Sequence, residues 1–262
     1  MAKRDIVDLE FVSDRDGSRE KALFHFPAGK RTVPLVVGLH TWSYDRFNQL
    51  EPMLPFCRER GWALLLPEFR GPNLSNNPRA RQACASPIAR QDILDSVEIV
   101  ANDYPIDRGS IFLLGGSGGG HMALMMAAKT PALWKGVSSW VPITDLASWH
   151  GENPDYAGHV AACCGGEPGK DKEVDREYRE RSPINFVKEL ADVTLSLHHG
   201  RFDRIVPFSQ SWRLAEKLVE YGAERFFFEI FNGGHELRYE RAFKWFDELQ
   251  SAGSEAEERL TG

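Results

Sequence analysis

Short apolar runs alternate with segments of helical periodicity along most of the sequence, which limits the chain to few architectures. Strands inside a parallel sheet are buried on both faces, so their sequences are largely apolar. Such runs occupy residues 34–39, 62–66, 111–114, 136–141, 193–198 and 225–231. Helical periodicity follows them at residues 47–60, 88–102, 122–128, 208–221 and 237–250. The alternation predicts an α/β fold, a doubly wound, mostly parallel sheet with helices on both faces.

The two ends of the chain follow other patterns. Residues 6–12 and 21–26 predict an antiparallel edge hairpin around the polar turn Asp14–Ser18. Residues 251–262 are polar, and we expect this tail to fray. Because no linker rich in Pro, Gly or Ser divides the sequence, we expect residues 1–262 to form a single domain.

One stretch breaks the alternation. Residues 145–190 are too long for a simple connection and too polar for a core, which predicts a lid-like insertion over a site. The insertion contains Trp149 and Tyr156, and aromatic side chains there would suit a sugar or an aryl group of a substrate. Packing in the interior explains these two residues equally well.

Composition narrows the class of partner. A chain of 262 residues buries roughly 70–75% of its unfolded surface, so it can fold without disulfides or metals. Its net charge of −6 and the lack of a basic stripe argue against nucleic-acid binding. The cysteines have no CxxC spacing, which argues against a metal site.

The N-terminal residues lack the apolar centre of a signal peptide, and no apolar stretch approaches the ~20 residues that span a bilayer. We therefore expect a cytoplasmic protein without a membrane partner.

The sequence Gly115-Gly116-Ser117-Gly118-Gly119 lies between an expected strand and an expected helix. A serine on so sharp a turn has a strained backbone, and only glycines leave room beside it. The turn lifts the Ser117 hydroxyl clear of the sheet and places the Gly118 N–H at a helix N-terminus, where negative charge is favoured. The pattern predicts a nucleophile at Ser117 and an oxyanion-stabilising amide at Gly118.

A nucleophilic serine needs a general base, and the base needs a partner that fixes its tautomer. Asp203 follows the expected strand 193–198, and His235 follows the expected strand 225–231. Catalytic groups on open α/β sheets gather at the carboxyl ends of the strands, so we expect Ser117, Asp203 and His235 to meet there. His198 and His199 point to opposite faces of a strand, which argues against a shared metal site.

In combination these motifs resemble the catalytic domain of the prolyl-oligopeptidase-like serine hydrolases (peptidase family S9) in the α/β-hydrolase superfamily. The resemblance runs from about Val33 to the last expected helix and rests on Gly115–Gly119, Gly200-x-x-Asp203-x-x-Val206-Pro207, Gly233-Gly234-His235 and Arg181-Ser182-Pro183-Ile184. It implies an α/β-hydrolase fold and a catalytic triad. In that triad Ser117 is the nucleophile, His235 is the general base and then the acid, and Asp203 orients His235. Such acyl transfer requires no cofactor.

The second oxyanion donor of this family comes from the loop after the strand expected at 34–39, where His-Gly-Gly or a similar sequence is usual. This chain has His40-Thr41-Trp42-Ser43 there. The resemblance implies the backbone N–H of Trp42 as the donor, with Thr41 as the alternative register. A tryptophan at the rim would narrow the acyl pocket, while a core position for the Trp42 ring is the alternative. The Arg70-Gly71 pair also resembles the family, in which such an arginine is often structural.

Three functions are compatible with these residues. Oligopeptidases of the family carry a β-propeller before the hydrolase domain, whereas here residues 1–33 precede the strand expected at 34–39. Stand-alone domains are often esterases, so our first hypothesis is a carboxylesterase that cleaves small acyl or acetyl esters through an acyl-enzyme. The alternative is a serine peptidase acting on short peptides, and a second alternative is a non-catalytic ligand-binding protein on a hydrolase fold. A peptidase would need carboxylates to anchor a peptide's amino terminus, and the insertion offers Glu167, Asp171, Glu173 and Asp175.

Overall fold

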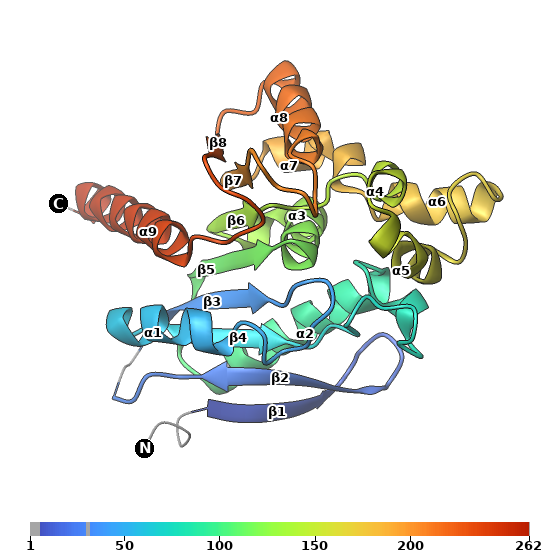
Figure 1. Cartoon of the computed structure of the whole chain (residues 1–262). Coiled ribbons are helices and arrows are strands. Elements are labelled where there is room, and N and C mark those ends of the chain that lie inside the picture. Colours follow the sequence, from blue (N-terminus) through green and yellow to red (C-terminus); the bar gives the residue numbers. More distant parts are fainter. Residues whose placement is uncertain (1–5, 30–31, 262) are drawn as a thin grey trace.

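Strands from along the whole chain form one sheet in the computed structural model, which describes the backbone of residues 6–29 and 32–261. The strands are β1 (Ile6–Val12), β2 (Arg19–His25), β3 (Val33–Leu39), β4 (Ala63–Pro67), β5 (Ile106–Gly116), β6 (Gly136–Trp140), β7 (Leu195–Gly200) and β8 (Phe226–Phe231). Their order is β1-β2-β4-β3-β5-β6-β7-β8 (Figure 1). β2 is antiparallel to β1 and β4, and the other neighbours are parallel. The doubly wound, mostly parallel sheet and its edge hairpin are confirmed.

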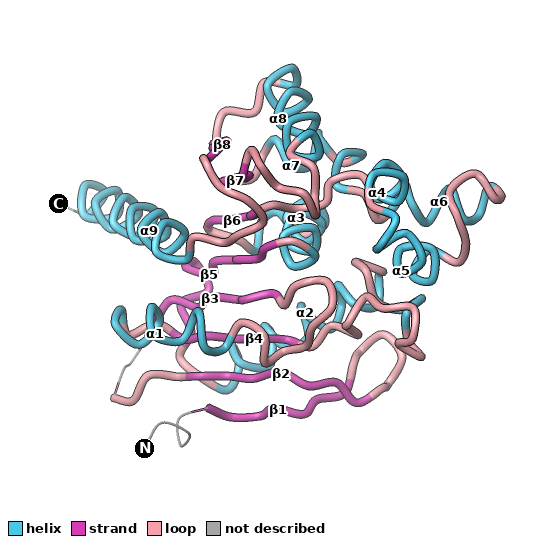
Figure 2. The backbone as a smooth tube through the Cα atoms, viewed as in Figure 1, coloured by secondary structure: helices cyan, strands magenta, loops and turns pink. Residues whose placement is uncertain are grey.

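Helices cover both faces of this sheet. They are α1 (Leu50–Arg60), α2 (Pro87–Asp103), α3 (Gly118–Lys129), α4 (Leu146–Glu152), α5 (Pro154–Cys164), α6 (Lys172–Glu180), α7 (Val187–Ala191), α8 (Ser209–Tyr221) and α9 (Tyr239–Thr261). Apolar side chains of α2, α3 and α8 form one core cluster with the sheet, and those of α1 and α9 form a second cluster. Figure 2 shows the loops after β3 and β4 on the same side of the sheet as α4, α5 and α6.

The loop after β3 is longer than the sequence predicts. The helix expected at 47–60 begins at Leu50, although it ends as expected before Gly61, whose φ of 64° is left-handed. Before Leu50, a polar side chain binds a backbone amide of the loop: Asn48 Oδ1 accepts the Thr41 N–H at 3.0 Å. Such local hydrogen bonds compete with the first helical turn.

The insertion at residues 145–190 is helical and consists mainly of α4, α5, α6 and α7. Its apolar side chains form a third cluster with Trp42, and this cluster lies on the side of the sheet where β3 ends. The α9 helix continues through Thr261, so the backbone of 251–261 is helical where the sequence predicts a frayed tail, while residue 262 lies outside the described residues. Within the described part of the chain, no helix has both the length and the apolar character needed to cross a membrane.

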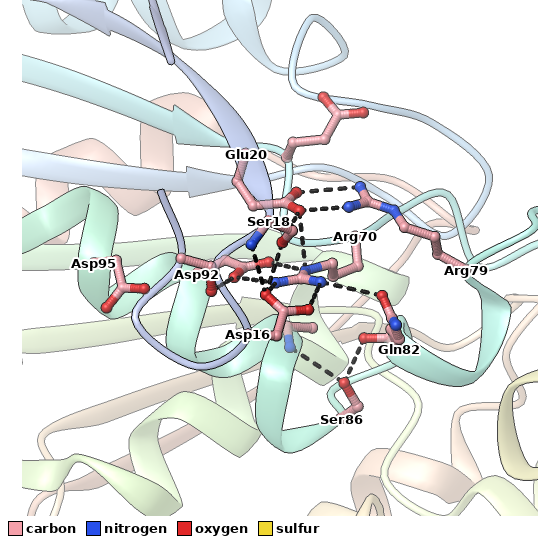
Figure 3. A network of polar contacts seen from close by, with 12 residues as sticks. Asp16, Ser18, Glu20, Arg70, Arg79, Gln82, Ser86, Asp92 and Asp95 are labelled. Atoms are coloured by element: carbon pink, nitrogen blue, oxygen red, sulfur yellow. Dashed lines mark hydrogen bonds and ion pairs between the residues drawn. The ribbon is translucent and has the colours of Figure 1, made fainter. Parts of the chain in front are cut away.

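A buried arginine ties the β1–β2 hairpin to the loop after β4 and to α2 (Figure 3). The Arg70 guanidinium contacts Asp92 on α2 through two nitrogens, one of them 2.9 Å from Oδ1, and also lies 3.3 Å from Glu20 on β2. Two further hydrogen bonds of 2.8 and 3.0 Å reach Asp16 in the hairpin turn. Arg79 shares Glu20 with Arg70. Segments that are distant in the sequence are thus joined through one cation.

Candidate active site

Ser117 occupies the turn between β5 and α3 in a backbone conformation that residues other than glycine rarely adopt. Its φ is 55° and its ψ is −122°, and its N–H donates to the Trp140 carbonyl at 2.9 Å. A Cβ on Gly115 would lie 2.1 Å from the Gly119 carbonyl oxygen, and one on Gly119 would lie 2.5 Å from the Leu39 carbonyl oxygen. The backbones approach so closely that both positions require glycine.

Asp203 and His235 meet at the carboxyl ends of β7 and β8. The His235 Nδ1 donates to Asp203 Oδ2 at 2.7 Å. The other carboxylate oxygen of Asp203 accepts the backbone N–H groups of Ile205 at 2.8 Å and Val206 at 3.0 Å. Because Nδ1 carries the proton, the Nε2 atom of His235 is left as the basic nitrogen. This is the tautomer that a general base requires.

His199 is a second histidine at Asp203, which the sequence analysis missed. It is completely buried, and its Nε2 donates to the Val206 carbonyl at 2.9 Å while also lying 3.3 Å from Asp203 Oδ2. Its Nδ1 accepts a hydrogen bond from the Ser211 hydroxyl at 2.7 Å. The available signal was its position at the end of a strand, four residues before Asp203. From the sequence we rejected a metal site for the pair His198 and His199 and expected one of them to be packed, but we did not infer a contact with Asp203.

The environment of Asp203 favours its ionised form. Burial by itself would raise the pKa of this carboxyl group, but the hydrogen bonds from His199 and His235 outweigh burial and hold the pKa well below its usual range. Asp203 is therefore a carboxylate at any pH near neutrality. A fixed negative charge beside Nδ1 stabilises the imidazolium that forms when Nε2 accepts a proton.

This depressed pKa predicts a pH dependence of stability. A carboxyl group whose pKa is lower in the folded than in the unfolded chain stabilises the fold above the unfolded pKa of about 3.9, and this stabilisation is lost as the pH falls toward the folded pKa. Between pH 4 and pH 2.5, the free energy of unfolding should fall more steeply in the wild type than in Asp203→Asn, by up to about 1.4 kcal/mol per pH unit. Urea unfolding at several pH values measures both slopes.

The exposed Asp155, at the start of α5, provides a control for removal of one carboxylate. Asp155→Asn should retain the steep wild-type slope between pH 4 and pH 2.5. Equal slopes in the wild type and Asp203→Asn would contradict the depressed pKa.

Two backbone amides lie side by side next to Ser117. Gly118 is the first residue of α3, so its N–H has no acceptor within the helix. A Cβ on Gly118 would lie 2.6 Å from the Cα and 2.7 Å from the N of Trp42. Thr41 donates its N–H to Asn48, whereas the Trp42 N–H has no partner among the described residues. Trp42 is thus the nearer and unpaired of the two amides, and its role as the second oxyanion donor stays a prediction.

The aromatic side chains expected at the substrate pack against one another. Trp42 is 2% exposed, and its ring centroid is 4.8 Å from Trp149 and 6.4 Å from Tyr156. Trp149 is 0% exposed and donates its indole N–H to the Ile205 carbonyl at 3.0 Å. Burial thus places Trp149 and the Trp42 ring in the interior and not along an open pocket. Tyr156 is half-buried at the edge of this cluster.

Two of the four carboxylates proposed as anchors in the insertion accept local backbone N–H groups. Asp171 caps α6 by accepting the N–H groups of Glu173 at 3.0 Å and Val174 at 2.9 Å. Asp175 accepts the Gly169 N–H at 2.7 Å. Each of these two carboxylates stabilises a turn or a helix end through Oδ1, whereas Glu167 and Glu173 are exposed.

Comparison with known proteins decides the family. Residues 88–251, more than half of the chain, match the prolyl oligopeptidase family. The chain belongs to this family. The resemblance inferred from the motifs is confirmed, and this member of the prolyl oligopeptidase family has the α/β-hydrolase fold.

Two curated relatives match parts of this chain at the same level of identity. The acylamino-acid-releasing enzyme of Homo sapiens is 27% identical over 219 residues, which cover 78% of this chain and 28% of that protein. The uncharacterized peptidase YtmA of Bacillus subtilis (strain 168) is 27% identical over 131 residues, which cover 50% of this chain and 49% of that protein. The match therefore spans about a quarter of the human relative and about half of the Bacillus relative.

Solved structures share the fold at low sequence identity. An acylaminoacyl peptidase of Pyrococcus horikoshii superposes with a TM-score of 0.71 at 18% identity over 95% of this chain and 41% of its own. A puromycin-hydrolyzing peptidase of Mycobacterium tuberculosis gives a TM-score of 0.73 at 20% identity, over 92% of this chain and 38% of its own. The serine hydrolase FphF of Staphylococcus aureus gives a TM-score of 0.71 at 15% identity, over 92% of this chain and 97% of its own.

Proposed function

We propose that this protein is a serine peptidase that cleaves short peptides whose amino terminus is acylated. The observation that carries the proposal is the hydrogen bond from His235 to Asp203, at the sheet edge where Ser117 stands beside the amides of Gly118 and Trp42. Nucleophile, base, orienting carboxylate and oxyanion donors are the groups that acyl transfer by a serine requires.

The proposed reaction follows from these positions. The Ser117 Oγ attacks the peptide carbonyl carbon as His235 Nε2 takes the hydroxyl proton, and the oxyanion accepts the N–H groups of Gly118 and Trp42. When the C–N bond breaks, His235 returns that proton to the leaving amine, and an acyl ester remains on Ser117. A water molecule then attacks the ester with His235 as base, which releases the acid and restores the serine. Asp203 stays ionised throughout and stabilises the imidazolium.

The names of similar proteins favour peptides over the esters that the sequence analysis placed first. The family and the Bacillus relative are named for peptidase activity, and the human relative is named an acylamino-acid-releasing enzyme. A second observation concerns the amino terminus of the substrate, because Asp171 and Asp175 already bind local backbone amides, which makes them poorer anchors for a charged amino terminus. A blocked amino terminus needs no such anchor, which favours an acylated substrate.

Three chromogenic substrates test this proposal. We expect turnover of N-acetyl-alanine p-nitroanilide with a kcat/KM about tenfold above that of alanine p-nitroanilide, a difference of ~1.4 kcal/mol in transition-state binding. The free amine would have to lose hydration without gaining a counter-charge. Initial rates on both anilides and on p-nitrophenyl acetate, each repeated with Ser117→Ala, provide the comparison.

Other outcomes would point to the alternatives. Turnover of the acetate ester alone would return the carboxylesterase to first place. Faster hydrolysis of the free-amine anilide would contradict the preference for acylated peptides. A protein that neither turns over these substrates nor reacts with a fluorophosphonate would be a binding protein on a hydrolase fold.

A further inference from the structure

A chain of hydrogen bonds connects the start of α9 with the loop that carries Trp42. The Tyr239 hydroxyl donates to Gln49 Oε1 at 2.7 Å, and Gln49 Nε2 donates to Asn48 Oδ1 at 2.7 Å. The same Asn48 oxygen accepts the Thr41 N–H at 3.0 Å. Gln49 is 2% exposed, so its amide contacts are shielded from water. Burial raises the pKa of Tyr239 to about 12, which keeps its hydroxyl protonated as a donor.

Both ends of this chain of hydrogen bonds lie close in the sequence to proposed catalytic groups. Tyr239 lies four residues after His235, at the first position of α9. At the other end, Thr41 directly precedes Trp42. Asn48 accepts the Thr41 N–H, whereas the neighbouring Trp42 N–H has no partner among the described residues. The Trp42 backbone lies beside Gly118.

We propose that Gln49 is a positioning residue for the second oxyanion donor, an inference that rests on the proposed function. Gln49 orients the side-chain amide of Asn48, and Asn48 accepts the Thr41 N–H. With Thr41 held in this way, the Trp42 N–H is left to bind the oxyanion. Through its hydrogen bond with Tyr239, the Gln49 amide is also connected to the segment that carries His235. Donor and base therefore keep one relative position, although they lie on segments about 190 residues apart.

Separate contacts hold the rest of this loop. The His40 ring stacks on Phe69 with centroids 3.8 Å apart, and its Nε2 donates to the Glu68 carbonyl at 2.8 Å. The Trp42 carbonyl accepts the Asn73 N–H at 2.8 Å. These contacts do not involve Gln49, so we expect the loop to stay folded when Gln49 is replaced and only the direction of the Trp42 amide to change.

The test is the kinetics of Gln49→Leu and Tyr239→Phe on N-acetyl-alanine p-nitroanilide. Loss of an oxyanion donor typically lowers kcat by 10²–10³, so a misdirected donor in Gln49→Leu should lower kcat about tenfold. KM should stay within about twofold, because the oxyanion forms only in the transition state. Tyr239→Phe removes one hydroxyl and should have a smaller effect of the same kind. The double variant should be no slower than Gln49→Leu, since both residues act through one chain.

Controls separate positioning from general damage. Gln91→Leu on α2 and Tyr221→Phe at the end of α8 make the same chemical changes away from the site and should leave kcat unchanged. The acid limb of the kcat/KM pH profile should be the same in Gln49→Leu as in the wild type, because the Asp203–His235 pair is intact.

The failing outcomes are distinct. A wild-type kcat in Gln49→Leu, a raised KM in place of a lower kcat, or a displaced acid limb would each overturn the role of Gln49 while leaving the peptidase in place. A wild-type protein without turnover would overturn the proposed function and the role of Gln49 with it.

Discussion

Replacing Ser117 by alanine is expected to abolish turnover and to leave the protein folded. Without the hydroxyl there is no nucleophile, and kcat should fall by a factor on the order of 10⁴ to 10⁶. The substitution adds no atoms at the elbow, where the glycines leave little space, and alanine bears the same backbone strain at a φ of 55° as serine does. Initial rates on the three substrates, with the unfolding temperature measured in parallel, test both halves of the prediction.

Covalent labelling makes this test independent of the choice of substrate. A fluorophosphonate should add one label to the wild type and none to Ser117→Ala, because the reagent reports an activated serine. Ser251→Ala on α9 is the matched control, and it should be labelled and turn over substrate like the wild type. Labelling or turnover retained in purified Ser117→Ala would falsify the assignment of the nucleophile.

Replacing Arg70 by methionine is expected to lower the free energy of unfolding by about 3–5 kcal/mol, as removal of one partner from a buried ion pair does. The Arg70 and Asp92 side chains have no exposed surface, and that of Glu20 is 1% exposed. Burial already raises the pKa of Asp92 against the opposing effect of Arg70. Methionine would fill part of the volume and leave Asp92 without its cation, whereas Glu20 would keep Arg79. Urea unfolding at pH 7 measures the loss.

The exposed Arg108 is the matched control. It makes two hydrogen bonds of 2.9 and 3.0 Å to Glu98, but the two side chains are 50% and 59% exposed. Arg108→Met should therefore cost less than about 1 kcal/mol. Adding Asp92→Asn to Arg70→Met should recover part of the stability, because it removes one unpaired charge. If Arg70→Met and Arg108→Met lowered the free energy of unfolding by similar amounts, burial would not explain how much the Arg70 ion pairs stabilise the fold.

The outline of the fold could be predicted because it depends on local patterns. Apolar runs such as 34–39 and 111–114 form strands in any sheet that buries both faces, and β3 and β5 contain them. Ser117, Asp203 and His235 follow β5, β7 and β8, and this places them at one edge, since parallel strands end on the same side. Periodicity and strand order were sufficient for this part.

Other features could not be predicted because they depend on partners distant in the sequence. Polar composition predicted a lid-like insertion at 145–190 without indicating its conformation, and tertiary packing against Trp42 stabilises helices there and buries Trp149. The periodicity at 47–60 gave no sign that Asn48 would bond Thr41 and delay the start of α1. His199 escaped notice because its contact with Asp203 requires the loop after β7 to fold back.

Hydrophobic periodicity and steric limits within a few residues are sufficient to predict the sheet, the glycine-lined elbow at Ser117 and the order of the proposed triad. Which backbone approaches Gly118, which side chains surround Arg70 and how Tyr239 contacts Gln49 depend on tertiary contacts. These arrangements join segments that lie far apart along the chain. Their hydrogen bonds form only after the sheet has brought those segments together.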